Sequence, residues 1–158
     1  MNSQNEIRSF RGKNAYLSNF YPCNIIYDGM TYKNLEAAFQ AAKCSDLTAR
    51  SQFQSLDPAE AKKLGRTVAL RDDWEKIKLI VLSELVRVKF IGFPELLDCL
   101  LATGGAYLSE DNTWHDNYYG NCTCTKCQDI PGQNYLGHIL MQLREQMRHS
   151  MQRFIEGI

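Results

Sequence analysis

The stretch Asn34-Leu-Glu36-Ala-Ala-Phe39-Gln40-Ala-Ala-Lys43 has a polar first residue and an alanine-rich run, a pattern that favours a helix. Asn34 is a good N-cap, and Glu36 would lie in the first turn, where the helix dipole stabilises a carboxylate. Glu36 and Lys43 are seven residues apart, close to two helical turns or about 10 Å of rise. We therefore expect an acid and an amine on one face of a helix.

Two interpretations of this Glu36–Lys43 pair stay open. A glutamate and a lysine on one helical face are most often part of a solvated surface. A carboxylate close to a lysine of lowered pKa can also support imine chemistry at a sugar carbon. The spacing alone does not decide between them.

Length and charge limit the classes of protein to consider. A chain of 158 residues can bury a core of its own, and we expect one domain over residues 1–158. Its 18 basic and 18 acidic side chains balance, unlike those of a protein that grips nucleic acid along many phosphates. No apolar run approaches the ~20 residues that span a membrane, and the start Met-Asn-Ser-Gln-Asn-Glu6 does not resemble a signal peptide. We expect a cytoplasmic protein with no membrane partner.

The remaining pattern predicts a mainly α (α+β) fold, compact and single-domain, with a small N-terminal β-hairpin or short strands. Asp28-Gly29 between two β-prone runs predicts the hairpin. Helices are expected over residues 58–64, 72–90, 94–102 and from about 134 to near the C-terminus, with a short strand over 106–110. The apolar face of the last helix predicts core positions at Leu136, Leu140, Leu143, Met147, Met151 and Phe154.

Residues 111–133 form a long irregular run, and loops of this length in a compact domain are commonly functional. Within it, Trp114 and Tyr119 are either core aromatics or a stacking wall for a nucleobase. Asp116 either caps the loop or acts chemically, and Asn19 is either a turn former or a site residue. The chain has no P-loop, no Gly-x-Gly-x-x-Gly and no His-Glu-x-x-His, which removes several enzyme classes.

The motifs taken together resemble the NADAR superfamily, also called YbiA-like, over nearly the whole chain. They are Leu17-Ser-Asn19-Phe20-Tyr21-Pro22, Glu36-x-x-Phe39-Gln40-Ala-x-Lys43, Ala61-x-x-x-Gly65-Arg66, Asp73-Trp74, Lys89-Phe90, Thr103-Gly104, Glu110, Asp116-x-x-Tyr119-Gly120 and Gly132-x-Asn134-x-Leu136-Gly137-x-x-Leu140-Met141-x-x-Arg144. The resemblance implies a compact, mostly helical domain that hydrolyses the N-glycosidic bond between a ribose carbon and a nitrogen. Two substrate classes go with it: ribosylamino intermediates of riboflavin synthesis, and ADP-ribose attached to guanine, removed by an antitoxin.

The resemblance also assigns roles to residues of this chain. It implies Lys43 as the catalytic amine, Glu36 as its paired acid and Asp116 as a second acid/base. It implies a substrate pocket formed by Asn19, Phe20, Glu110, Trp114 and Tyr119, with Tyr119 standing where the family commonly has tryptophan. Phosphate partners are expected among Arg8, Arg66 and Arg144.

The implied mechanism begins with carboxylate-assisted opening of the ribose ring. Neutral Lys43 then attacks C1″ and expels the base, and water hydrolyses the resulting imine. Lys43 must therefore lose its proton near pH 7, well below the usual pKa of ~10.4. This chemistry needs no cofactor and no metal.

Six cysteines fall into two groups. Cys23, Cys44 and Cys99 are isolated, whereas Cys122-Thr-Cys124-Thr-Lys-Cys127 has the look of a metal knuckle. Structural zinc usually takes four protein ligands, and His115 or His138 would complete such a site. The three thiols can equally pack in a loop without metal. An ion held there would be structural.

Three functions stay under consideration. The leading one is an ADP-ribosyl-guanine glycosidase acting on an ADP-ribosylated nucleotide or nucleic acid, with a cognate ADP-ribosyltransferase toxin as its partner. The second is an N-glycosidase of riboflavin intermediates. The third is a non-catalytic module that binds ADP-ribose or NAD, and the intact Glu36 and Lys43 count against it.

Overall fold

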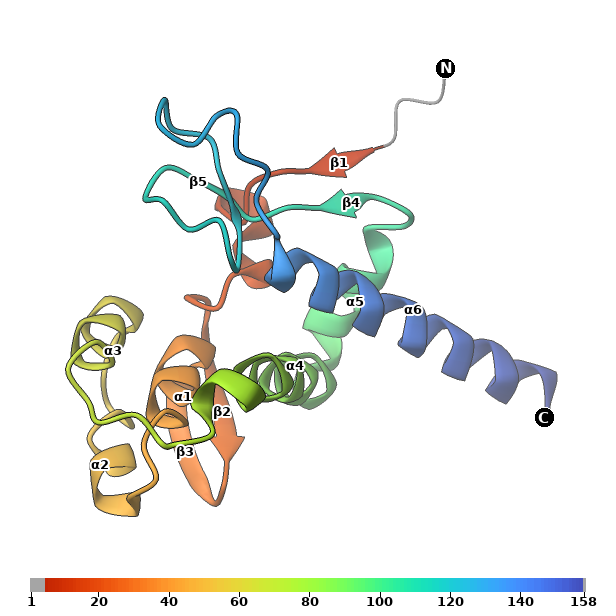
Figure 1. The fold of residues 1–158 in the computed structure, drawn as a ribbon. Helices are drawn as coiled ribbons and strands as arrows, with labels where there is room; N and C mark the ends of the chain where they lie inside the picture. The colour runs from red at the N-terminus through yellow and green to blue at the C-terminus, as the bar shows by residue number, and fades with distance from the viewer. Residues whose placement is uncertain (1–4, 158) are drawn as a thin grey trace. The chain divides into compact units, whose positions relative to one another are not determined.

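The computed structural model describes residues 5–157, so most of the segment Met1–Glu6, which was predicted not to be a signal peptide, lies outside the described residues. The chain divides into two compact units, one of Asn19–Phe93 and the other of Met1–Ser18 with Pro94–Ile158. Helices dominate both, and the strands are short (Figure 1). The expected mainly α (α+β) class is confirmed. No helix within the described residues has both the length and the apolar character to cross a bilayer.

The unit of residues 19–93 opens with the expected hairpin, β2 (Pro22–Tyr27) paired antiparallel with β3 (Met30–Asn34). Asp28 and Gly29 form its turn with φ angles of 48° and 76°. Positive φ at both central residues is what a type I′ turn requires, and Asp-Gly supplies it at low cost. Ile25 and Tyr32 are opposite each other in the hairpin and both are buried, and the two strands contact the helix that follows.

Helix α1 (Leu35–Ala41) follows the hairpin directly, and Asn34 caps it as predicted, because its side chain accepts a hydrogen bond from the Ala37 N–H at 2.8 Å. The helix ends two residues before Lys43, so the expectation that Lys43 belongs to this helix was wrong. The Lys43 N–H donates to the Gln40 carbonyl in a tighter turn, and the Lys43 carbonyl accepts from the Arg71 N–H at 2.7 Å. That contact with a distant segment replaces the next helical bond.

Three more helices complete this unit. Helix α2 (Leu47–Ser51), which Asp46 caps, was not predicted from the sequence. Helix α3 (Pro58–Leu64) has the predicted capping box of Asp57 and Glu60. Helix α4 (Trp74–Gly92) buries its apolar face, and Trp74 contacts Phe39 of α1 with ring centroids 5.2 Å apart.

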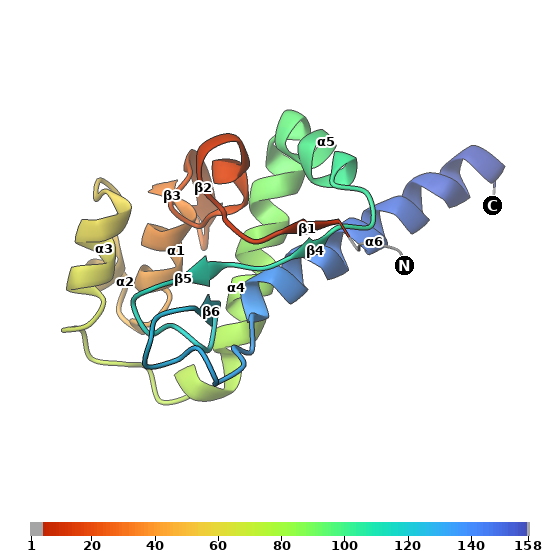
Figure 2. The ribbon, with the colours of Figure 1, turned by 90° about the horizontal axis from the view of Figure 1, so that it is seen from above.

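In the other unit, β1 (Glu6–Ile7) pairs in parallel with β4 (Tyr107–Leu108), and β5 (Asp111–Asn112) with β6 (Asn121–Cys122) (Figure 2). The expected strand over 106–110 is therefore only two residues long. The helical elements of this unit are the 3₁₀ helix η1 (Gly12–Leu17), α5 (Pro94–Ala102) and α6 (Tyr135–Glu156).

Helix α6 begins where the sequence predicted, after Asn134, whose side chain binds the Leu108 carbonyl at 2.8 Å and the Glu110 N–H at 3.1 Å. Leu136, Leu140 and Leu143 are buried as expected. Met151 and Phe154 are 49% and 87% exposed, so their assignment to the core was wrong. An apolar stripe at helical spacing cannot reveal where the packed part of a long helix ends.

Candidate active site

Glu36 lies in the first turn of α1 and is only 5% exposed. Its Oε1 accepts a hydrogen bond of 2.7 Å from Nε2 of Gln40, one turn further along the helix. Its backbone N–H donates to the Asn19 carbonyl at 3.1 Å, which satisfies a helix N-terminal donor and brings Asn19 to the start of α1. Gln40 thus orients the carboxylate, and the preceding loop fixes the backbone of Glu36.

Gln40 lies against Gly65, the residue that ends α3. A Cβ atom at Gly65 would come within 1.9 Å of Gln40 Oε1. The φ angle of Gly65 is −62°, so the position needs glycine for close approach and not for an unusual backbone. Gln40 Oε1 is buried and has no hydrogen-bond partner among the described residues. The Gln40 side chain is therefore held by its close packing against Gly65 and by its hydrogen bond to Glu36.

Lys43 is half-buried in the turn after α1, and its Nζ donates to the Gly65 carbonyl at 3.2 Å. Burial lowers the pKa of Lys43, the nearby Glu36 carboxylate acts to raise it, and the positive charges of Lys62 and Arg66 lower it further. The net shift is downward, because loss of hydration and two cations outweigh one carboxylate. The neutral amine required for nucleophilic attack is thereby favoured.

Phe20, next to Asn19, is 43% exposed, and the ammonium group of Lys62 lies 5.9 Å from its ring centroid. The unit of residues 19–93 therefore contains four of the predicted site residues: Asn19, Phe20, Glu36 and Lys43. It adds Gln40, Lys62 and Gly65, which were not predicted as site residues. The (i, i+4) spacing of Glu36 and Gln40 was the available signal for the first of these.

The other four predicted site residues belong to the second unit: Glu110, Trp114, Asp116 and Tyr119. Asp116 Oδ1 accepts hydrogen bonds from the backbone N–H groups of Tyr118 and Tyr119, at 3.1 and 2.9 Å. This is the loop-capping role that was one of the two interpretations of Asp116. It holds Tyr119 in place, and the ring of Tyr119 packs edge-on against Tyr118 with centroids 4.8 Å apart.

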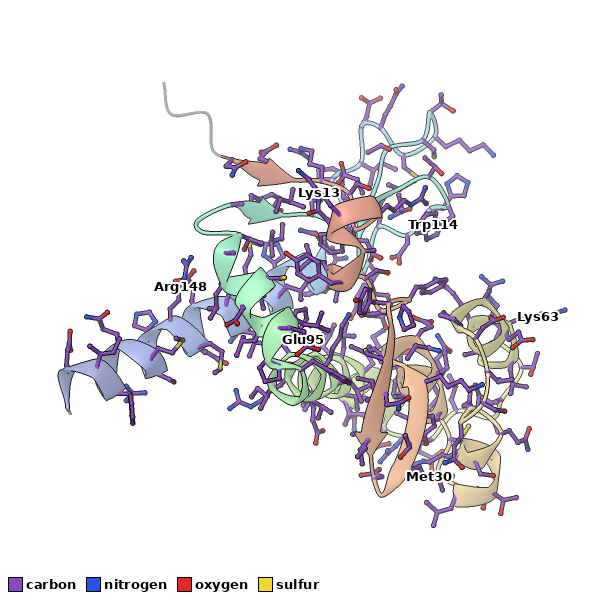
Figure 3. The ribbon with its side chains drawn as sticks, turned by 180° about the vertical axis from the view of Figure 1, so that it is seen from behind. Lys13, Met30, Lys63, Glu95, Trp114 and Arg148 are labelled. Carbon is purple, nitrogen blue, oxygen red and sulfur yellow. The ribbon has the colours of Figure 1, made fainter. Side chains whose placement is uncertain are left out.

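Trp114 is 47% exposed and lies on the irregular loop, where Figure 3 labels it. The Arg11 guanidinium lies 5.5 Å from its ring centroid. An exposed indole beside a cation is suited to stacking against a flat ring. The Glu110 N–H donates to the side-chain oxygen of Asn134, and the Glu110 carbonyl accepts from the Asn121 N–H at 3.0 Å. The backbone of Glu110 therefore helps to organise the loop.

The three arginines expected to bind phosphate differ in what they contact. Arg144 is buried and donates to the Thr103 hydroxyl at 2.8 Å and the Ala106 carbonyl at 2.9 Å, so its contacts are structural. Arg8 pairs with Glu6 at 2.6 Å. Arg66 is exposed and acts on the pKa of Lys43. Of the three, Arg66 fits the expectation best.

Three cysteine side chains and one histidine side chain lie close together in the irregular loop. Sγ of Cys122, Cys124 and Cys127 and a ring nitrogen of His115 all lie within 4.8 Å of one another. His138, the other candidate for a fourth ligand, is not part of this cluster.

Fold and site thus describe a mainly helical α+β protein with a buried carboxylate that acts electrostatically on an amine of lowered pKa. The family model of the NADAR domain matches residues 8–148. The chain belongs to the NADAR family.

Individual relatives agree with this assignment. The chain is 38% identical over 133 residues to the N-glycosidase YbiA of Escherichia coli, covering 82% of this chain and 79% of that protein. It is 34% identical over 137 residues to a riboflavin biosynthesis protein of Vibrio vulnificus, covering 85% of this chain but only 36% of that protein. The NMR structure of E. coli YbiA superimposes with a TM-score of 0.77 at 32% identity, covering 95% of this chain and 92% of that one.

Proposed function

We propose that this protein is an N-glycosidase that cleaves the bond between a ribose C1 and a base nitrogen through a covalent imine on Lys43. The observation that carries the proposal is the lowered pKa of Lys43 beside the buried, oriented Glu36. An amine nucleophile must be neutral, and a lysine made less basic by burial and by neighbouring cations meets that requirement. The name of the E. coli relative, N-glycosidase, supports the same reaction class.

The proposed reaction starts when a carboxylic acid protonates the ring oxygen of the ribose, which breaks the C1–O bond and leaves an iminium between C1 and the base nitrogen. Neutral Lys43 adds to C1, a proton moves to the base nitrogen, and the base departs with that proton. The lysine imine then takes up water, and the C1–Nζ bond breaks to return Lys43 and release the sugar aldehyde, which recloses. Glu36 carries the proton transfers near Lys43. Asp116 is proposed as a second acid/base.

We propose ADP-ribose on guanine as the substrate, with a cognate ADP-ribosyltransferase toxin as the enzyme whose modification it reverses. Lys62 and Arg66 give the surroundings of Lys43 a positive charge that suits a phosphorylated sugar. The exposed aromatic side chains Phe20 and Trp114 offer surfaces for a base. Such a reaction would take place in the cytoplasm, with the modified nucleic acid.

Ribosylamino intermediates of riboflavin synthesis are the second candidate substrate. The relatives from Vibrio vulnificus and from maize are named riboflavin biosynthesis proteins, which favours this candidate. Both substrates carry phosphate on a ribose, so the charge around Lys43 suits either.

Parallel assays of the two substrates test the proposal. One measures release of ADP-ribose from ADP-ribosylated guanine in DNA, and the other release of ribose 5-phosphate from the pyrimidine intermediate. Lys43→Ala should abolish whichever activity the wild type has, whereas Lys63→Ala should leave it unchanged. Lys63 is a suitable control because it is exposed on α3 beside Lys62, and it points away from the helix in Figure 3. Activity on neither substrate would instead support the non-catalytic binding module.

A further inference from the structure

The cysteine-bearing loop of residues 111–133 is connected by hydrogen bonds but contains little regular structure. Its regular structure is limited to the two-residue strands β5 and β6. A hollow of about 360 Å³ in this loop is lined mainly by polar residues, and Ile130 beside it is 54% exposed. In a loop of this length with so little apolar packing, a further cross-link would add to the order that the hydrogen bonds supply.

Four potential metal ligands meet in this loop. Nδ1 of His115 lies 3.3 Å from Cys124 Sγ and 3.4 Å from Cys127 Sγ, and with Cys122 Sγ all four ligand atoms lie within 4.8 Å of one another. In a tetrahedral zinc site, Zn–S and Zn–N bonds of about 2.3 and 2.0 Å place ligand atoms roughly 3.5 to 3.8 Å apart. The four atoms are thus close to the positions that one tetrahedral ion would give them.

The backbone around these side chains is arranged for ligation. The Cys127 N–H donates to the Cys124 carbonyl at 2.9 Å, which folds the Cys124-Thr-Lys-Cys127 segment into a tight turn with both sulfurs together.

Cys122 and His115 are brought to this turn by separate contacts. The Cys122 N–H donates to the Asn117 side chain at 2.7 Å, and pairing of β6 with β5 fixes the strand that bears it. His115 has a φ of 67°, a left-handed conformation that a non-glycine residue adopts at a cost. A bound ion would compensate for that cost.

We propose that His115, Cys122, Cys124 and Cys127 bind one Zn²⁺ ion as a structural site. Three thiolates and one imidazole in tetrahedral arrangement select zinc over magnesium or calcium, which prefer oxygen ligands. Four protein ligands leave no position for a reactive water, so the ion orders the loop and takes no part in bond cleavage. The site stands independently of the proposed glycosidase activity.

Metal analysis of the full-length chain, expressed with zinc and purified under reducing conditions, tests the site. We expect about one zinc per chain, as four protein ligands imply. Zinc should be lost in Cys124→Ser and His115→Ala, and kept in the matched controls Cys99→Ser and His138→Ala. His115→Cys should restore binding, because four cysteines also form a tetrahedral zinc site. Absence of zinc from the wild type, or equal zinc in all variants, would overturn the proposal.

Proteolysis gives a second readout that does not depend on enzyme activity. Lys126 is an exposed trypsin site between two of the ligands. Chelation of the metal from the wild type should start rapid cleavage after Lys126, and re-addition of Zn²⁺ should stop it. In the His115→Ala variant, trypsin should cleave after Lys126 whether or not zinc is present. Equal cleavage of the wild type before and after chelation would contradict a zinc-ordered loop.

Discussion

The side-chain amide of Gln40 donates a 2.7 Å hydrogen bond to the buried carboxylate of Glu36 one helical turn away. A carboxylate that transfers protons during catalysis must be held in one orientation, and Gln40 supplies the donor that does so. Gln40 is therefore a positioning residue in the proposed reaction.

Replacing Gln40 with methionine keeps the length of the side chain but removes this donor. We expect kcat to fall by about 10- to 100-fold, the scale on which a misplaced catalytic group lowers a rate. KM should change little, because Gln40 is not proposed to contact the substrate. Steady-state kinetics measure both, with the exposed Gln52→Met as control. A variant with the kcat of the wild type would show that Glu36 needs no help from Gln40.

Gly65→Ala introduces a Cβ within 1.9 Å of Gln40 Oε1. The crowding should destabilise the protein by about 1–3 kcal/mol, the usual cost of overpacking. It should also lower activity, because Gln40 must move. Gly92→Ala is the control, since a Cβ there meets nothing within 4 Å.

The same substitution in a Gln40→Ala background tests the cause of that effect. With the glutamine side chain removed, Gly65→Ala should cost much less stability in urea unfolding, which gives a clear coupling in the double-mutant cycle. Purely additive effects would mean that Gly65 matters for another reason.

Lys62→Gln removes one of the cations that lower the pKa of Lys43. The pKa of Lys43 should rise, so a smaller fraction of the amine is neutral at pH 7. The rising limb of the kcat/KM profile should therefore move to higher pH. Lys63→Gln on the same helix should leave the profile in place. Identical profiles for all three proteins would remove Lys62 from the tuning of Lys43.

Titration of Lys89 should make the stability of the protein depend on pH. Burial lowers the pKa of this lysine, which is 1% exposed, to about 8, although its ammonium lies 5.3 Å from the ring centroids of Tyr21 and Phe90. Between about pH 8 and the ordinary pKa of ~10.4, the folded state has released the proton while the unfolded state retains it. The contribution of Lys89 to the free energy of unfolding must therefore rise with pH across that window.

The difference in the free energy of unfolding between the wild type and Lys89→Met isolates this contribution. We expect the difference to change in favour of the wild type by up to roughly 3 kcal/mol from pH 7.5 to 10.5. Other thiols and the tyrosines that titrate there cancel in the difference, except for Cys23, whose pKa is raised by burial and lowered by the charge of Lys89. A flat difference would mean that Lys89 keeps its ordinary pKa in the folded protein.

Much of the local structure follows from short-range signals in the sequence. Asp28-Gly29 predicted the hairpin, and Asp57, Pro58 and Glu60 predicted α3, because turn and cap chemistry depend on neighbouring residues. The end of α1 could not be predicted this way. The Lys43 N–H already bonds to the Gln40 carbonyl in a tighter turn, and the Lys43 carbonyl accepts from the N–H of Arg71, 28 residues further along the sequence.

In the candidate site as well, features set by neighbouring residues could be predicted and features set by distant segments could not. The residue types and spacing of Glu36 and Lys43 pointed to an acid and an amine, but the pKa of Lys43 depends on its burial in the folded chain and on Lys62 and Arg66 in another segment. The role of Gly65 could not be foreseen either, since a glycine after a helix looks like a stop signal and here makes room for a side chain. Similarly, only the folded loop distinguishes His115 from His138 as the companion of the three cysteines.

Trapping of the reaction intermediate tests the central claim, that Lys43 forms the imine. Borohydride added during turnover reduces an imine to a stable amine, and mass spectrometry of tryptic peptides then locates the sugar adduct. We predict an adduct on Lys43 that is absent from Lys43→Ala and present in Lys63→Ala. The absence of any adduct from an actively turning-over wild type, or an adduct on another lysine such as Lys89, would contradict the account.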